Sequence, residues 1–314
     1  MKSLGVFFAL GAVSMAGEIA LKQDESSVDV TVNGEPFATV VFGDGKVRRK
    51  PVIYPVFGPE GQRMTRDYPF KETEGEADDH PHHESMWFNH GDANGVSFWH
   101  VNEGSGTIET REVLRAEDGI VEFRNEWVMP DGEILISDVT KFVFSVRENG
   151  DRVIDHYVTL TAEVDDLHLG DEKDSGLGIR MHPNLRLKND KKRGVSSANG
   201  KVRNSDGVDT YPEVWGKRAK WVGYWGEIDG KTYGVSVLDH PSNRGFPTVW
   251  HARDYGLLAA NPWGVGAFKL GPEGAGAQIM KKGETLSLKY RFVFHRGDTA
   301  EAKIDDIFSE WSKN

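Results

Sequence analysis

Histidines are concentrated in one short segment of the chain. The stretch DDHPHHESMWFNHGDANGVSFWH, residues 78–100, contains His80, His82, His83, His90 and His100 out of 11 histidines in the sequence. Imidazole is the side chain that most readily gains or loses a proton near neutral pH, and its neutral form binds transition metals. The segment is therefore a candidate for metal binding, for proton transfer beside a polar ligand, or for a loop stiffened by buried polar groups.

The proline within DDHPHH predicts an extended start to this segment, because proline removes a backbone donor and restricts the residue before it. Side chains alternate along an extended chain, so we expect His80 and His82 on one side and His83 on the other. His80 and His82 supply two metal ligands, and a distant histidine such as His240 would be the third, since such sites need three convergent groups. His83 with Glu84 instead suits a proton transfer.

A second candidate motif is SGLGIRMHPN, residues 175–184. In a strand, Arg180 and His182 lie on one face, while Ile179 and Met181 fill the other. The guanidinium offers several fixed donors and the imidazole can give or take a proton, so the pair suits an oxygen-rich ligand. In the alternative interpretation, Arg180 pairs with a nearby carboxylate such as Asp174, and His182 caps a loop.

A third motif, VLDHPSNRGFPTVWHARDYGLLAANPWG at residues 237–264, repeats features of the first two. His251 and Arg253 have the spacing of the earlier Arg/His pair in reverse order, and a second DHP tripeptide echoes residues 79–81. Tryptophans flank these polar groups. We therefore expect all three motifs to border one cleft, to which this one brings Asp239, His240, Asn243, Trp250, His251, Arg253, Asp254 and Trp263.

The elements that would position these residues are antiparallel strands. Residues 28–42 alternate apolar and polar side chains on both sides of Asn33-Gly34, a strong hairpin signal. Residues 107–164 repeat the pattern across the turns EDG, PDG and RENGD, residues 219–240 form another hairpin around a DG turn, and residues 284–295 give a late strand. Only residues 300–314 have helical spacing. The sequence predicts an all-β fold, a large antiparallel β-sandwich with a short C-terminal helix, as a single domain over residues 17–314.

Composition and the first residues restrict the compartment and the partners. The chain has a formal net charge of -11 and no cysteine, which excludes thiolate chemistry and disfavours nucleic acid or anionic membrane as a partner. Lys2, a short apolar run and the small residues Ser14 and Ala16 predict that residues 1–16 are a removed secretory signal, although a buried first strand is the alternative. We expect a periplasmic or secreted protein with no membrane association after signal removal and no cofactor.

Five segments resemble a bacterial family known as PmoA-like, or domain of unknown function 6807: YPVFGPEGQRMTRDYPF, DDHPHHESMWFNHGDANGVSFWH, GLGIRMHPN, WGKRAKWVGYWG and VSVLDHPSNRGFPTVWHARDYGLLAANPWG. The resemblance covers most of residues 50–295, in order. The label refers to a methane monooxygenase subunit with several membrane spans, which this chain lacks after its signal. The resemblance implies a supersandwich similar to galactose mutarotase, a group with many carbohydrate-acting members that use a histidine acid and a carboxylate base. Where the family has Lys-Glu-Gly, this chain has Lys173-Asp174-Ser175, which shortens the reach of the carboxylate.

These observations favour a secreted carbohydrate-active enzyme, an epimerase, hydrolase or lyase that uses general acid and base catalysis on a sugar or an oligosaccharide. The alternatives are a His-ligated metalloprotein of oxygenase or hydrolase type and a non-catalytic glycan-binding module. The expected catalytic residues are His83, His182, His251 and Asp254. The expected substrate-binding residues are Trp99, Arg180, Asp239, His240, Asn243, Arg253 and Trp263, with the tryptophans stacking on a sugar ring.

Overall fold

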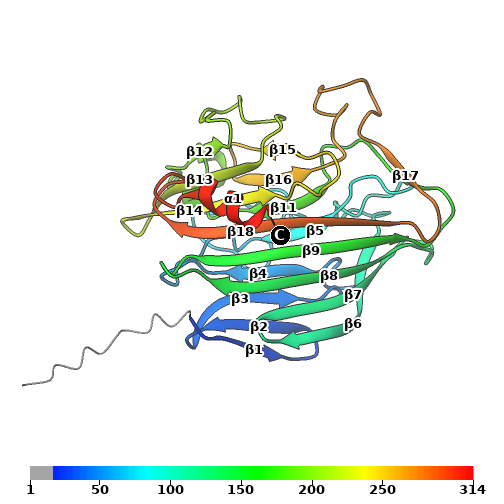
Figure 1. The fold of residues 1–314 in the computed structure, drawn as a ribbon, viewed down its shortest axis with the longest axis horizontal. Coiled ribbons are helices and arrows are strands. Elements are labelled where there is room, and N and C mark those ends of the chain that lie inside the picture. Colours follow the sequence, from blue (N-terminus) through cyan, green and yellow to red (C-terminus); the bar gives the residue numbers. More distant parts are fainter. Residues whose placement is uncertain (1–16, 314) are drawn as a thin grey trace, which may run out of the picture.

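Two eight-stranded antiparallel sheets form the body of the computed structural model, which describes residues 17–313 (Figure 1). The predicted signal, residues 1–16, lies outside the described residues. In spatial order, the first sheet consists of β1 (Ile19–Gln23), β2 (Ser27–Val32), β3 (Glu35–Val41), β4 (Val52–Val56), β5 (Met86–Asn89), β11 (Gly176–Arg180), β16 (Leu257–Asn261) and β15 (Val249–Ala252).

The second sheet is made of longer strands. In spatial order they are β12 (Lys201–Asn204), β13 (Trp221–Ile228), β14 (Lys231–Asp239), β18 (Thr285–Arg296), β9 (Arg152–Ala162), β8 (Ile134–Val146), β7 (Ile120–Val128) and β6 (Thr107–Glu117). A separate small pair joins β10 (Leu167–Leu169) to β17 (Gln278–Met280), and two short 3₁₀ turns are η1 (Pro183–Leu185) and η2 (Lys191–Arg193).

Local turn chemistry explains the hairpins. Asn33 and Gly34 join β2 to β3, and Asp229 and Gly230 join β13 to β14, with positive φ at all four residues. Asn, Asp and Gly are the residues that tolerate this conformation, and such two-residue turns match the twist of the strands they join. The predicted hairpins and the meander from β6 to β9 are confirmed.

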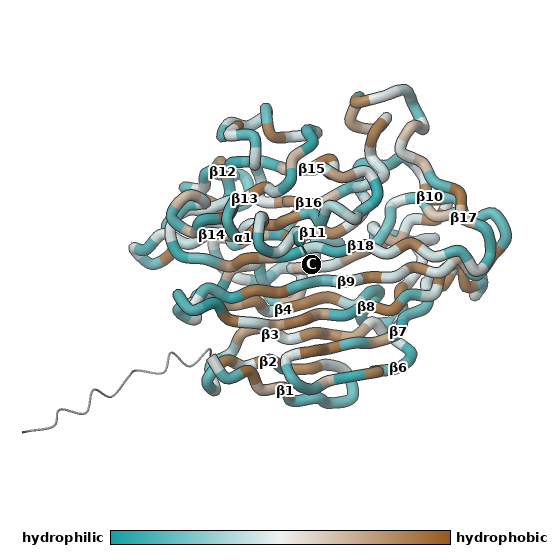
Figure 2. The backbone as a smooth tube through the Cα atoms, viewed as in Figure 1, coloured by the Kyte–Doolittle hydropathy of each residue, from teal (hydrophilic) through white to brown (hydrophobic). Residues whose placement is uncertain are grey.

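The apolar face of each sheet packs against the other. Along β8, for example, Phe142 and Phe144 are buried while their neighbours are partly exposed. Figure 2 shows apolar stretches along the strands of both sheets and polar residues in the loops at their ends. Because strand side chains alternate, the residues between those buried positions of β8 face outward. On the first sheet, β11, β15 and β16 are buried on both faces, so other segments cover the outer face there.

The helix α1 (Ile304–Trp311) covers the outer face of the second sheet (Figure 1). Its buried side chains, Ile304, Ile307, Phe308 and Trp311, pack with Val153, Trp221, Leu238 and Val293. The prediction of an all-β sandwich of two large antiparallel sheets with a short C-terminal helix is confirmed. Within residues 17–313, the structure has no helix with the length and apolar character that crossing a membrane requires.

Candidate functional site

A row of side chains crosses the outer face of the first sheet. The strand registers place Val52 opposite Trp87, Trp87 opposite Gly178, Gly178 opposite Ala259, and Ala259 opposite His251. A Cβ atom on Gly178 would lie 2.5 Å from two atoms of the Trp87 indole, so the ring covers this glycine. The row forms a flat apolar floor that ends at the imidazole of His251.

The histidine loop between β4 and β5 lies over this floor as a tight turn. The backbone N–H of His83 donates to the carbonyl of His80 at 2.9 Å, and the two rings stack with centroids 4.7 Å apart. The predicted alternation of His80 and His83 is therefore wrong. Pro81 occupies the second position of a β-turn, which its fixed φ favours, and the turn brings both rings to the same side.

The ring of His82 lies between two other imidazoles. Its centroid is 4.6 Å from that of His83 and 4.8 Å from that of His100, which belongs to the loop between β5 and β6. Burial lowers the pKa of His82 to about 3, and the charge of His100 acts in the same direction. The His82 imidazole is thus neutral at physiological pH, and a neutral imidazole can accept a proton.

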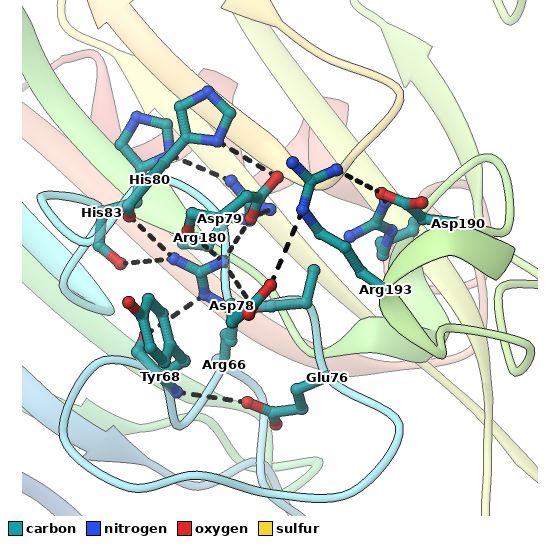
Figure 3. Close-up of polar contacts among 12 residues, drawn as sticks. Arg66, Tyr68, Glu76, Asp78, Asp79, His80, His83, Arg180, Asp190 and Arg193 are labelled. Atoms are coloured by element: carbon teal, nitrogen blue, oxygen red, sulfur yellow. Dashed lines mark hydrogen bonds and ion pairs between the residues drawn. The ribbon is translucent and has the colours of Figure 1, made fainter.

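A buried ionic network holds the histidine loop in place (Figure 3). Asp79 accepts hydrogen bonds from Arg66 at 2.6 Å and from Arg180 at 2.7 Å, and Arg180 also lies 2.9 Å from Nδ1 of His83. Burial alone would raise the pKa of Asp79, but the His80 hydrogen bond and the two guanidinium charges lower it below its usual range. The carboxylate therefore stays ionised between the two arginines.

This network also sets the protonation state of His83. A guanidinium can only donate, so Nδ1 of His83 must be the acceptor and its proton sits on Nε2. Burial and the charge of Arg180 lower the pKa of His83 well below its ordinary value. The partner of Arg180 is Asp79 rather than Asp174, which the sequence suggested as an alternative.

The carboxyl group of Asp174 lies between two histidines from different parts of the chain. One oxygen is 3.7 Å from Nδ1 of His251 and the other is 3.8 Å from Nε2 of His100, and the side chain is 35% exposed. Burial raises the pKa of Asp174, although neighbouring cations, His100 first among them, oppose the shift. A partly exposed carboxyl group with a raised pKa is a candidate proton donor.

His251 supports the loop that carries Asp174. Its Nδ1 lies 3.2 Å from the carbonyl oxygen of Lys173, to which it can donate a hydrogen bond. Burial lowers the pKa of His251 to about 3, with the charge of Arg253 as the next cause. A neutral ring with its proton on Nδ1 fits this contact, so His251 orients the backbone next to Asp174.

Tyr255 connects the histidine loop to the third motif. Its half-buried ring stacks on His80 with centroids 5.1 Å apart, and the guanidinium carbons of Arg180 and Arg253 lie 4.6 and 5.0 Å from its centroid. Burial raises its pKa to about 12, so the phenol keeps its proton. We use the name histidine site for the group His80, His82, His100, Asp174, His251, Arg253 and Tyr255.

The predicted stacking tryptophans do not face this site. Trp99 and Trp263 have no exposed surface. Trp99 packs against Trp87, with ring centroids 5.2 Å apart, and Trp263 packs against His90 at 4.8 Å. Both fill the interior because indole is the largest apolar side chain. The partly exposed aromatic rings are those of Tyr255 and of Trp215, whose centroid is 6.4 Å from that of His251.

The second DHP segment lies elsewhere, at the end of β14 in the other sheet. Asp239 accepts hydrogen bonds from Asn243 at 2.7 Å and from the backbone of Thr248 at 2.8 Å, all buried. His240 packs against Trp311 of α1 with centroids 4.9 Å apart. The expectation that these residues share a cleft with the first histidine motif is wrong, because β14 lies in the sheet whose outer face carries the helix.

His182 and Asp254 are also placed outside the histidine site. Because β11 ends at Arg180, strand alternation does not extend to His182, whose Nδ1 accepts from the backbone of Asn184 at 3.3 Å and caps η1. Asp254 pairs with Lys188 and borders a separate cleft of about 370 Å³. His83, Arg180, His251 and Arg253 are the predicted residues that the structure brings together.

The metal alternative required His80, His82 and a distant histidine to converge. His240 is on the outer face of the other sheet, so this set does not assemble. Across residues 17–313, no three His, Asp or Glu side chains have an arrangement that could hold a metal ion.

A larger open cleft of about 730 Å³ adjoins the histidine site on the far side of Asp79. Arg193 reaches into this region, where its guanidinium lies 3.6 Å from Asp78 and 3.1 Å from Asp190 (Figure 3). The cleft carries charges of both signs and is lined by Tyr68, Glu72, Thr73, Glu76, Ala77, Asp78, Asp79, Lys192 and Arg193.

The expected catalytic and substrate-binding residues did not include His100, Asp174 or Tyr255, although His100 belongs to the histidine-rich segment. Asp174 had appeared only as a departure from the family pattern and as a partner for Arg180. Tyr255 directly follows the His-Ala-Arg-Asp run, and its spacing from His251 was the available signal. Their importance comes from contacts between loops that are far apart in the sequence.

Comparison with known proteins gives one family match. A family model described as a family of unknown function (DUF6807) matches residues 27–309. This confirms the resemblance to family 6807, but the match carries no information on the label PmoA-like. No curated protein matches the chain significantly.

Several solved structures are weakly similar to this chain. A galactose mutarotase related enzyme from Lactobacillus acidophilus has a TM-score of 0.37 and 9% identity, covering 88% of this chain and 97% of that one. A GalM/aldose epimerase homologue from C. elegans has a TM-score of 0.30 and 9% identity, covering 90% and 100%. A glycoside hydrolase family 97 enzyme from Pseudoalteromonas sp. strain K8, in complex with panose, has a TM-score of 0.35 and 10% identity, covering 88% of this chain but 33% of that one. Likenesses this weak carry no conclusion about activity.

Proposed function

The chain belongs to the DUF6807 family, and we propose that it is an enzyme that transforms a sugar or sugar derivative by general acid–base catalysis at the histidine site. The observation that carries the proposal is the position of Asp174. Its carboxyl group is partly exposed, lies within 4 Å of nitrogen atoms of His100 and His251, and has a raised pKa.

The acid and base roles are assigned from the pKa shifts of two groups, since the environment raises the pKa of one and lowers the pKa of the other. Asp174, whose pKa is raised by burial, is the group assigned to donate a proton to a ring oxygen or a leaving oxygen. His82, whose pKa is lowered to about 3, is a neutral acceptor for a substrate proton, and His100 lies between the two groups. His83 and His251 act as positioning residues, since the contacts of their Nδ1 atoms are made with Arg180 and with the Lys173 carbonyl.

A polyhydroxylated substrate fits the remaining features of the site. Sugar rings bind against aromatic faces, while their hydroxyl groups need several nearby donors and acceptors. Tyr255 and Trp215 offer partly exposed rings, and imidazole, carboxyl and guanidinium groups surround them. We also propose that the protein is exported to the periplasm or the medium, as the sequence predicts. Sequencing the N-terminus of the mature protein tests this.

The test is a screen of free sugars, glycosides and uronates with the purified protein, followed by proton NMR spectroscopy. We expect the wild-type protein to convert at least one of them and Asp174→Asn to lower kcat by about 10²- to 10⁴-fold, the usual contribution of one proton-transfer group. Asp165→Asn is the matched control, because Asp165 is exposed and, among residues 17–313, its side chain makes no hydrogen bond or ion pair that would be lost. Circular dichroism should show that both variants are folded.

Two results would reject this function. One is full activity of Asp174→Asn on a sugar that the wild-type protein converts. The other is binding of sugars by the wild-type protein without conversion of any of them, which would instead identify a glycan-binding module.

A further inference from the structure

Arg253 is a cation without an anionic partner in the histidine site. Within residues 17–313, its guanidinium makes no hydrogen bond and no ion pair, and its Nε has no exposed surface. A guanidinium that is partly removed from water normally recovers its lost hydration through a carboxylate or a carbonyl oxygen. The absence of such a contact leaves its donors available for a ligand.

The other arginines near the histidine loop show the usual pattern. Arg66 and Arg180 share the carboxylate of Asp79, and Arg186 lies 3.8 Å from Asp190. Those three side chains are buried, whereas Arg253 is partly exposed and, among the described residues, has no carboxylate or carbonyl partner. Among the described residues its close partner is the Tyr255 ring, which can orient the plane of the guanidinium but cannot accept hydrogen bonds from its edge.

Arg253 is close enough to His251 and to the proposed acid for its charge to act on both. It follows His251 by two residues, and its charge contributes to lowering the pKa of His251 and opposes the raised pKa of Asp174. Lys173, next to Asp174, is a second cation with no ion pair among the described residues, and its Nζ lies 5.6 Å from the Trp215 ring centroid. Two cations without an ion pair among the described residues, Lys173 and Arg253, therefore act on the carboxyl group of Asp174, in a chain whose net charge is -11.

We propose that Arg253, assisted by Lys173, binds a carboxylate on the substrate, so that the substrate class of the histidine site is an acidic sugar such as a uronic acid. The inference rests on the proposed function. Arginine presents two parallel N–H groups that match the two oxygens of a carboxylate, and such charge-assisted pairs are strong and directional. A sulfate ester presents oxyanion oxygens to the same fork, so a sugar sulfate is included among the probes below.

A carboxylate bound to Arg253 would also change the protonation of Asp174. It would neutralise Arg253, which otherwise favours the ionised form of Asp174. The proton of Asp174 would then be held more firmly when substrate is present than when the site is empty. The same contact therefore selects the substrate and prepares the acid.

Isothermal titration calorimetry with matched ligands tests this assignment. The probes are glucuronate and galacturonate, their neutral counterparts glucose and galactose, and glucose 6-sulfate. We expect the wild-type protein to prefer the uronates, with an affinity that falls as salt is added. Arg253→Gln should weaken uronate binding by roughly tenfold to a hundredfold, as expected for loss of a charge-assisted contact, and should weaken the binding of neutral sugars much less.

Arg253→Lys and Lys173→Gln separate geometry from charge. Lysine keeps the charge but loses the fork, so it should recover only part of the uronate affinity, and Lys173→Gln should have a smaller effect than Arg253→Gln. Asp165→Asn serves as the control, and circular dichroism confirms folding of each variant.

Equal wild-type affinity for uronates and neutral sugars, unchanged uronate binding by Arg253→Gln, or a preference for the sulfate ester would overturn the inference. Conversion of neutral sugars alone, with dependence on Asp174, would reject the acidic substrate and leave the proposed catalysis intact. Uronate binding through Arg253 without any conversion would reject the catalysis and leave the carboxylate site intact.

Discussion

Replacing Gly178 by alanine tests whether the floor of the site is as tightly built as its geometry indicates. An added Cβ would lie 2.5 Å from Cε2 and Cζ2 of Trp87. Real Cβ atoms do not approach other atoms so closely, and the fused indole ring cannot bend away. Trp87 is itself confined, since its ring packs against Trp99 and stacks on His83 with centroids 5.2 and 5.3 Å away.

The sign of the change in the free energy of unfolding shows whether the added methyl group clashes with its neighbours. Where the backbone is compatible and space is free, Gly→Ala stabilises a protein by about 0.4–1 kcal/mol, because the unfolded chain loses conformational freedom. Overpacking of a filled region costs about 1–3 kcal/mol. We expect Gly178→Ala to lower the free energy of unfolding by an amount in the second range, and to weaken ligand binding because a tilted Trp87 displaces His83.

A double-mutant cycle with Trp87→Leu provides the measurement. Urea unfolding followed by circular dichroism gives the cost of Gly178→Ala in both backgrounds. Leucine has no atoms where the six-membered ring of Trp87 lies, so the second cost should fall by about 1 kcal/mol or more, and coupling of this size is typical of residues in contact. An identical cost in the two backgrounds, or stabilisation by Gly178→Ala alone, would refute the packing described here.

Two buried carboxyl groups give stability predictions of opposite pH dependence. Burial raises the pKa of Asp239 to about 7, so the folded protein binds more protons than the unfolded chain, and stability should fall as pH rises from about 4 to 7, by on the order of 4 kcal/mol. In Asp239→Asn, urea unfolding across this range should lose that slope; a slope equal to wild type would exclude Asp239 as its source. Asp79→Asn should cost about 3–5 kcal/mol at neutral pH, because it leaves Arg66 and Arg180 without their shared anion. An unchanged urea midpoint of this variant at neutral pH would contradict the network. Since the pKa of folded Asp79 is lowered, the stability that its carboxylate contributes is present above the unfolded pKa of about 3.9 and is lost as the pH falls below it.

Sequence reasoning was reliable where short-range chemistry decides the structure. Asn33-Gly34 and Asp229-Gly230 adopt positive φ and make hairpins because these residue types tolerate that conformation wherever they occur. The helical spacing near the C-terminus produced α1 because one apolar stripe had to be buried. Alternation along the long strands likewise determined which side chains face the core, and these local preferences were sufficient to predict an antiparallel β-sandwich.

The site depends on strand order and loop contacts, which the sequence does not display. Arg180 and His83 are 97 residues apart but lie 2.9 Å from each other, because β5 and β11 are neighbours in the first sheet. The two DHP segments look alike, yet one adjoins the histidine site and the other ends a strand of the opposite sheet. Asp174 likewise has its raised pKa only in the folded protein. Residue type and local spacing therefore determined the elements and the available chemical groups, whereas pairing between distant strands decided which groups meet, since distance and burial set hydrogen bonding and proton affinity.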